Sequence, residues 1–539
     1  MDRVSTCRQF RHVGPTFYRK LLSVTALPRQ VFDKSFRQEV GIWYFNPMIH
    51  VRTPQSRCRF SLAWDDITPP PDIYHRMWGA AKHERATGVH RPLRATVAVF
   101  AAAEGSTPSA QPCDALQIVL ALDHCVLGAV EHEQLVSQVA KATGQPREVF
   151  LVVFSHTHAA GLMELERASL PGGDLIPGYL RRVGERAAEL VNEALARLVP
   201  ADIVYGAGRC NLAANRDFFD AAIGQFVCGF HPAVTADDTV LLARVTDPRS
   251  RLLATVINYA CHPTTLAWDN TLISPDYIGA LREVVECETS APCLFLQGAS
   301  GDLGPVEGYV GDPAVADRNG RQLAYAALSA LTALPAAGTR FHYRGPVVSG
   351  ATLGVWAHEP LSAGGLEAQT RWQIWRWREL LPYRSDRPKP AQVEAELRHF
   401  ETEEKTARTA GDTLRADECR AMAERKARLL HRLSHLPSGD MFPLQVMLWR
   451  IGDAFWLGVQ GEFYSVFQTE LRRRFPRATI LIATNAADWG ASYLPPREIY
   501  GKGIYQETIA VVSPGSLEQV IASVAKRIEG SLQEAPLVS

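Results

Sequence analysis

The strongest constraint on the fold is an alternation of short apolar runs with longer helix-forming stretches. Between residues 202 and 350, runs such as LLATVINYACH and PCLFLQGAS are rich in apolar residues and short enough to be buried strands. Stretches between them, such as DYIGALREVVE, have the apolar spacing of amphipathic helices. This alternation is typical of an α/β architecture with functional sites at strand ends. We therefore expect an α/β fold, a mixed-sheet domain with helices around it.

The chain of 539 residues changes character twice. Residues 1–58 have mixed polarity and no clear period, which predicts a poorly ordered N-terminal extension before a globular domain at residues 59–539. Residues 359–438 are charged and helix-forming, and we expect an inserted helical hairpin with a mostly solvated face. Within it, Trp372 and Trp375 have the spacing of one helical face, which favours packing against the body over a substrate lid.

The charge balance and the hydropathy exclude several classes of protein. Lys and Arg total 57, as do Asp and Glu, so no net charge attracts nucleic acid or an anionic membrane. No apolar stretch approaches the length of a transmembrane helix, and the N-terminus lacks the apolar region of a secretion signal, so we expect a cytoplasmic protein. The ten cysteines have no regular spacing and are interpreted as reduced core thiols. The oligomeric state is left open.

Three apolar strands end in residues that can bind a metal ion. LVVFSHTHAAG carries His156 and His158, TVINYACHPTTL carries His262, and FWLGVQGEF carries Glu462. Side chains at i and i+2 of a strand point to the same side, so we expect both imidazoles of the first motif to face one cavity. Two histidines and a carboxylate form a frequent ligand set for catalytic zinc. Each residue alone is more often structural, but three such strand ends together favour a metal site.

Eight motifs, in chain order, resemble those of the neutral/alkaline, non-lysosomal ceramidase family. The resemblance spans about residues 60–535. It implies a domain that binds zinc through two histidines, a glutamate and a tyrosine, and that hydrolyses an N-acyl amide. The motifs are DITPPP, GVHRPLRATV, FSHTHAAG, NLAANRD, NYACHPTTL, QGASGDLGP, GVQGEF and SYLPPREIYGKGIYQE.

The resemblance also implies roles for individual residues. His158 would lie close to the metal, Arg216 would face the active site, and Tyr505 would lie near the scissile group. Asp302 would orient a ligand or the metal-bound water, as outer carboxylates do. The open alternatives are a structural arginine at 216 and a loop-capping aspartate at 302. The implied zinc ligands are His156, His262, Glu462 and Tyr493.

The chain departs from the family at three points. The family's Gly-Asp-x-Ser-Pro reads GDLGP here, so Gly304 replaces a serine with an essential catalytic role. DWGASY keeps only the second tyrosine of Asn-x-Tyr-x-x-Tyr, and the family's β-sandwich domain has no counterpart. We therefore expect a divergent, catalytic-domain-only zinc hydrolase that cleaves an amide or ester bond with metal-activated water.

Two alternatives to this hydrolase stay open. The first is a non-catalytic member that binds metal or an acyl ligand as a sensor or scaffold, which Gly304 motivates. The second is a two-metal enzyme that cleaves phosphoesters. Such a site needs more carboxylates near the histidines than these motifs supply.

Overall fold

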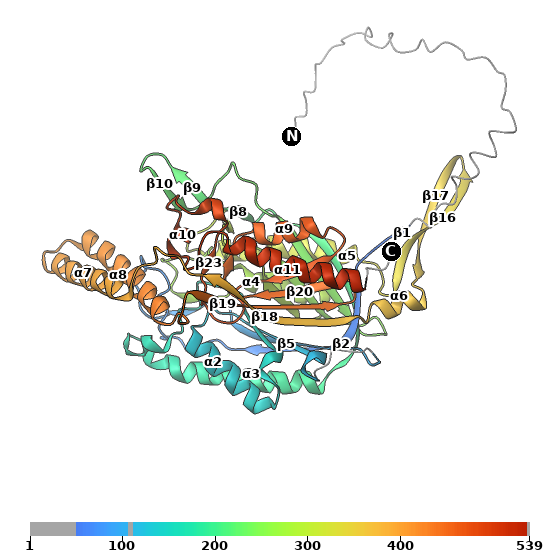
Figure 1. Ribbon diagram of the computed structural model, residues 1–539, viewed down its shortest axis with the longest axis horizontal. Helices are drawn as coiled ribbons and strands as arrows, with labels where there is room; N and C mark the ends of the chain where they lie inside the picture. The colour runs from blue at the N-terminus through green and yellow to red at the C-terminus, as the bar shows by residue number, and fades with distance from the viewer. Residues whose placement is uncertain (1–49, 106–111, 536–539) are drawn as a thin grey trace, which may run out of the picture. The chain divides into compact units, whose positions relative to one another are not determined.

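Two β-sheets packed face to face form the centre of the molecule (Figure 1). The computed structural model describes residues 50–105 and 112–535, and those from Val51 onward belong to one compact unit. In the larger sheet, β5 is parallel to β6 and β12 to β14, while the other pairs are antiparallel. Its order is β14 (Cys293–Gln297), β12 (Leu252–Tyr259), β11 (Thr239–Thr246), β7 (Val199–Arg209), β2 (Gln55–Asp66), β4 (Arg94–Ala101), β5 (Leu116–Leu122) and β6 (Phe150–Phe154).

The smaller sheet covers the inner face of the larger one. Trp449 and Trp456 are paired on neighbouring strands and stack with ring centroids 5.7 Å apart, and Phe100 of the larger sheet packs against both. At Gly458 a Cβ would come within 2.6 Å of Leu151, so the two sheets approach closely there. The order is β18 (Trp372–Pro382), β19 (Met441–Ile451), β20 (Ala454–Val459) and β22 (Thr479–Ala483).

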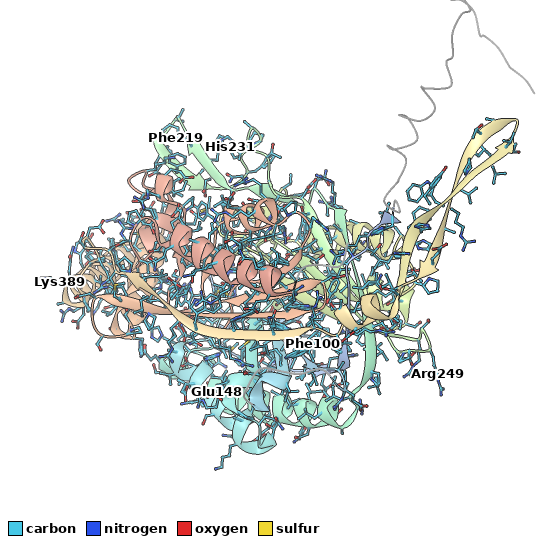
Figure 2. All side chains as sticks on the ribbon, turned by 45° about the vertical axis from the view of Figure 1, so that its right-hand side comes forward. Phe100, Glu148, Phe219, His231, Arg249 and Lys389 are labelled. Atoms are coloured by element: carbon cyan, nitrogen blue, oxygen red, sulfur yellow. The ribbon has the colours of Figure 1, made fainter. Side chains whose placement is uncertain are left out.

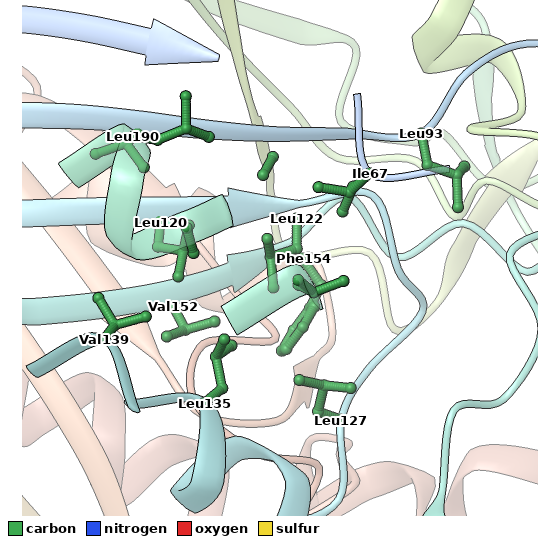
Figure 3. Close-up of a cluster of buried hydrophobic side chains, with 14 of the residues drawn as sticks. Ile67, Leu93, Leu120, Leu122, Leu127, Leu135, Val139, Val152, Phe154 and Leu190 are labelled. Atoms are coloured by element: carbon green, nitrogen blue, oxygen red, sulfur yellow. The ribbon is translucent and has the colours of Figure 1, made fainter. Parts of the chain in front are cut away.

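Helices cover the outer faces of both sheets and complete four layers. The apolar faces of α2 and α3 bury Leu120, Leu122 and Val152 of the larger sheet (Figure 3). α4 and α5 cover the other half of that sheet, and α9 and α11 cover the smaller sheet. The α/β fold with a mixed sheet and surrounding helices is thus confirmed. These helices are α2 (Ala129–Thr143), α3 (Ile176–Ala196), α4 (Tyr277–Thr289), α5 (Pro313–Thr332), α9 (Val466–Arg474) and α11 (Ser516–Glu534).

The prediction that the tryptophan-rich segment around Trp372 and Trp375 is helical is wrong. Trp372 and Trp375 lie in strand β18, where a separation of three residues puts side chains on opposite faces. Trp372 is buried between the sheets, and Trp375 packs on the side of α11. Both tryptophans do pack against the body, but as strand residues. The aromatic and β-branched content of the segment suits a strand, and its pairing with β19 overrides the helical spacing.

The helical hairpin consists of α7 (Pro390–Thr409) and α8 (Thr413–Ser434) and connects β18 to β19. Lys389, which precedes α7, and Arg249, in the turn before β12, lie at opposite ends of the unit (Figure 2). Strand β12 runs away from Arg249 towards His262. The hairpin is therefore at the end of the sheets where β12 delivers that histidine.

The N-terminal boundary differs from the expected one. Strand β2 begins at Gln55 and pairs with β7, and Cys58 is buried, so the end of the range 1–58 belongs to the central sheet. Residues 1–49 of the expected extension lie outside the described residues.

The remaining elements are short or lie outside the two sheets. Among the described residues, no helix has both the length and the apolar character needed to cross a bilayer. The strands are β1 (His50–Val51), β3 (Gly88–Val89), β8 (Ala213–Asn215), β9 (Asp217–Asp220), β10 (Gln225–Cys228), β13 (Leu272–Ile273), β15 (Leu303–Pro305), β16 (Thr339–Ser349), β17 (Ala351–Pro360), β21 (Glu462–Phe463) and β23 (Tyr493–Leu494), and the helices are α6 (Ala363–Ala368) and α10 (Tyr505–Ile509).

Candidate metal centre

Three donor atoms from three strand ends meet in one buried cluster. His156 follows β6, His262 follows β12, and Glu462 begins β21 directly after β20. The Nε2 atoms of the two histidines are 3.0 Å apart, and each lies 3.2 Å from Oε2 of Glu462. All three side chains are at least nine-tenths buried. The expected histidines and glutamate are thus brought together from positions more than one hundred residues apart.

Backbone carbonyls fix the protonation of both imidazoles. Nδ1 of His156 is 2.7 Å from the Cys125 carbonyl oxygen, and Nδ1 of His262 is 2.8 Å from that of Ser300. A carbonyl only accepts a hydrogen bond, so each Nδ1 carries a proton and, in the neutral imidazole, Nε2 presents a lone pair. The Nε2 lone pairs of two neutral imidazoles and a carboxylate oxygen would then face one another, which is unfavourable unless a proton or a metal cation lies between them.

Electrostatics set the protonation of each group in the cluster. Burial and the positive charge of Arg216 lower the pKa of His262 to about 3, so its imidazole is neutral at pH 7. Burial opposes ionisation of Glu462, but His156 and His262 overcome it and hold its pKa well below the ordinary value. Burial also opposes protonation of His156, but Cys125 and Glu462 overcome it and raise its pKa well above the ordinary value, so without a metal this imidazole holds a proton beside Glu462. A metal ion would take the place of that proton, and neutral nitrogen with anionic oxygen are donors that zinc accepts.

Tyr493 lies beside this cluster, as the resemblance implied. Strand β23 pairs in parallel with β21, and the register places Tyr493 opposite Glu462. Its hydroxyl is 3.5 Å from Nε2 of His262 and accepts a hydrogen bond from Arg216 Nη2 at 3.1 Å. Burial raises the pKa of Tyr493 well above its ordinary value, and Arg216 acts in the opposite direction.

His156 and His158 line one cavity, but not through the expected strand geometry. Strand β6 ends at Phe154, and His156 has a left-handed backbone with φ of 66°. This loop conformation, rather than strand alternation, places the two ring centroids 5.0 Å apart. Nε2 of His158 is buried and has no hydrogen-bond partner among the residues that the structure describes. Burial and the neighbouring His156 and His262 lower its pKa well below the usual range.

Arg216 is held rigidly beside the cluster. Its guanidinium donates to the Gly301 carbonyl at 2.8 Å and to Tyr493, and only 3% of the residue is exposed. Tyr505, at the start of α10, also lines the cavity, with its ring centroid 5.9 Å from that of Tyr493. Both side chains are therefore positioned to reach a ligand bound in front of the histidines.

Asp302 does not contact the histidines. Its carboxylate accepts hydrogen bonds from the backbone nitrogen and hydroxyl of Ser465, at 2.6 and 2.8 Å. Burial raises its pKa to about 6. These contacts favour the loop-capping alternative, in which Asp302 holds the start of α9. Sequence reasoning missed this because the partner is 163 residues away along the chain.

Gly304 lies next to the cavity and has room for a side chain. A Cβ there would meet Arg216 Cδ and Thr264 Oγ1, each at 3.8 Å, which is ordinary van der Waals contact. The Thr264 hydroxyl oxygen is buried and finds no partner within the described part of the chain. The glycine is therefore not required by packing.

A cavity of about 410 Å³ opens in front of the donor cluster, a size typical of small-molecule sites. One part of its wall is aromatic, because Trp78, Trp268 and Tyr309 pack edge-on and stacked against one another. Another part is α8 of the hairpin, which presents Arg425, Arg428 and Arg432. The prediction that the hairpin is mostly a solvated face is wrong for this side of α8.

Sequence reasoning missed these arginines, although a signal was present. Arg425, Arg428 and Arg432 have spacings of three and four, which place them on one face of α8. Spacing shows only that they share a face and cannot show what that face contacts. Trp489, whose Nε1 lies 3.4 Å from Oε1 of Glu462, was also missed, since its motif DWGASY was interpreted only for tyrosines.

The fold has counterparts among solved structures. Neutral ceramidase from Pseudomonas aeruginosa superposes with a TM-score of 0.57 at 16% identity, covering 91% of this chain and 76% of that one. The fold is similar to that of neutral ceramidase. A ceramidase complexed with C2 also superposes with a TM-score of 0.57 at 16% identity, covering 90% of this chain and 77% of that one. No protein-family model matches the chain, and no curated protein matches it.

Proposed function

We propose that this protein is a zinc-dependent hydrolase that cleaves an N-acyl amide, or an ester of similar shape. The observation that carries the proposal is the convergence of two imidazole Nε2 atoms and one carboxylate oxygen within 3.2 Å of one another. The fold shared with neutral ceramidase supports an acyl-amide substrate with a lipid-like part.

The residues present fit a zinc ion. Ligands about 2.1 Å from a tetrahedral zinc lie about 3.4 Å apart, close to the observed separations. His156, His262 and Glu462 would hold the ion, with Tyr493 as a fourth protein ligand and a water added as a fifth. When bound, zinc lowers the pKa of water and polarises a carbonyl oxygen.

The other residues supply proton transfer and charge stabilisation. His158 stays neutral at pH 7, and its unpartnered Nε2 can take a proton from water and pass it to the leaving amine. Arg216 and Tyr505 can stabilise the negative charge that develops on the carbonyl oxygen. Because Arg216 is already fixed to Gly301, little reorganisation accompanies that step.

The absence of a serine at position 304 motivates a second candidate function. With Gly304, the site lacks the hydroxyl that the ceramidase motif supplies there. The protein would then bind metal or an acyl ligand without turning it over, as a sensor or scaffold. Its cytoplasmic location stays a prediction.

Measuring turnover distinguishes the proposed hydrolase from a protein that only binds metal or an acyl ligand. Zinc-loaded protein is offered a panel of N-acyl amides and esters, beside Glu462→Gln, which removes the anionic ligand at nearly constant size. We expect turnover by the wild type and a loss of at least about 10²-fold in the variant. Wild-type protein that retains one zinc per chain and turns over no compound would leave the binding-only function.

A further inference from the structure

Among residues 50–105 and 112–535, Arg432 is a buried cation without a carboxylate partner. Only 6% of the residue is exposed, and its one hydrogen bond is a long contact of 3.4 Å to the Ile509 carbonyl. Its Nε has no partner among the described residues. The guanidinium lies over the Trp489 ring, 4.2 Å from the centroid. A buried charge is normally paired, so this arginine is incomplete as the protein stands.

The part of the Arg432 guanidinium that lacks a partner among the described residues faces the cavity in front of the donor cluster. Arg432 lines that cavity together with Glu462, Tyr493 and Tyr505. Burial lowers the pKa of Arg432, and the carboxylate of Glu462 counteracts this, which places the guanidinium within reach of its field. A ligand in the cavity can therefore approach both Arg432 and the metal ligands.

The cavity as a whole carries excess positive charge. Four arginines line it, against two glutamates. Glu424 forms ion pairs with Arg428 at 2.7 Å and with Arg167 at 3.1 Å, and Glu462 belongs to the donor cluster. Arg425 contacts the Thr508 hydroxyl at 3.0 Å. A divalent metal ion would add to this excess, so a neutral ligand leaves the charge of the cavity unbalanced.

We propose that the pocket is built for an N-acyl amide whose amine-side group carries an anion, a carboxylate or a sulfonate, held by Arg432 with Arg425 beside it. This proposal rests on the proposed function, because it assigns the substrate class of the same site. A planar guanidinium pairs with two oxygens of such an anion at once. The aromatic surface of Trp78 and Trp268 would then receive the acyl chain.

One competing explanation is that Arg432 stabilises the carbonyl oxygen of any substrate. The two roles differ in their dependence on the amine-side group. If Arg432 binds the anion, it increases kcat/KM for charged substrates only. If it binds the carbonyl oxygen, it increases kcat/KM for all amides equally.

The test compares amides that share one acyl group and differ in the charge of the amine-side group. N-hexanoylglycine and N-hexanoyltaurine are offered to the zinc-loaded full chain, beside N-hexanoylglycine methyl ester and N-hexanoylethanolamine as neutral probes. We expect amide-bond kcat/KM to be at least about tenfold higher for the two anions, from one charge-assisted contact. Arg432→Gln should remove this preference, Arg432→Lys should keep part of it, and the exposed Arg398→Gln on α7 should leave it unchanged.

A binding measurement keeps this inference separate from the proposed function. Calorimetric binding of N-hexanoylglycine and its methyl ester is compared in Glu462→Gln and in Glu462→Gln/Arg432→Gln. Acid binding at least about tenfold tighter than ester binding, lost with Arg432, supports the anion site even where no compound is turned over, in which case only the proposed function fails. Equal use of acid and neutral probes, or an equal loss for both on Arg432→Gln, overturns the inference.

Discussion

The donor cluster and the hairpin wall form two sides of one cavity and are built in opposite ways. The cluster is buried, its side chains come from strand ends, and backbone carbonyls at Cys125 and Ser300 fix its imidazoles. The wall is a helix of the inserted hairpin that forms ion pairs with the body, such as Glu424 with Arg167. The comparison teaches that the donor cluster is built into the ends of the sheets, whereas the opposite wall of the cavity comes from an inserted hairpin.

The largest expected effect falls on the cluster. His156→Ala/His262→Ala removes two ligands and should abolish stoichiometric metal, with a loss of at least about 10³-fold in turnover. Metal content by plasma mass spectrometry and the circular dichroism spectrum are measured on protein purified like the wild type. The exposed His399→Ala, on α7, is the matched control. Metal retained by the double variant would show that the cluster is not the metal site.

The next largest effect tests whether the attachment of α8 to the body depends on ion pairs. Arg428 and Arg167 overcome the effect of burial and lower the pKa of Glu424 to about 2. Since its folded pKa is below the unfolded value, the carboxylate stabilises the protein above about pH 4.5, and this contribution is lost as pH falls towards 2. Glu424→Gln should lower the free energy of unfolding by about 3 kcal/mol at pH 7 and leave the metal content unchanged.

Urea unfolding at several pH values measures this effect. Glu418→Gln, in an exposed pair with Arg415, is the control and should change stability by less than about 0.5 kcal/mol. A Glu424→Gln variant as stable as that control would mean that the wall is attached by packing instead.

His158 belongs to the cavity between the two regions. His158→Ala should retain one metal per chain and lose about 10²-fold in kcat, since it removes the group assigned to proton transfer. The pH profile of kcat is the added readout, because a change of packing alone would not flatten it. Full turnover with full metal would remove His158 from catalysis.

The smallest effect is expected at Gly304. A serine there meets only ordinary contacts, so Gly304→Ser should change stability by less than about 1 kcal/mol and turnover by less than about tenfold. Gly461→Ser is the contrasting control, because its φ of 99° and a carbonyl 2.8 Å from the new Cβ predict strain. Loss of metal in Gly304→Ser would show that the cavity cannot accept the family's serine.

The sequence predicted the strand-end part of the site well and the wall poorly. His156, His262 and Glu462 were found because a strand end constrains where the following residue can lie. The contact of Asp302 with Ser465 and the cavity-facing side of α8 depend on tertiary packing between distant segments, which periodicity does not encode. Trp372 shows the same limit, since its spacing suited a helix until pairing with β19 decided the strand.

The attachment of the hairpin has a consequence for divergence. Strands β18 and β19 pair as far as Pro382 opposite Met441, so the chain leaves and re-enters the sheet at one point. Everything between these residues takes the place of a tight turn, and loop closure depends only weakly on length. A segment joined in this way can be exchanged, lengthened or removed during evolution without moving a strand. The hairpin wall of the cavity and the donor cluster can therefore be inherited separately within one chain.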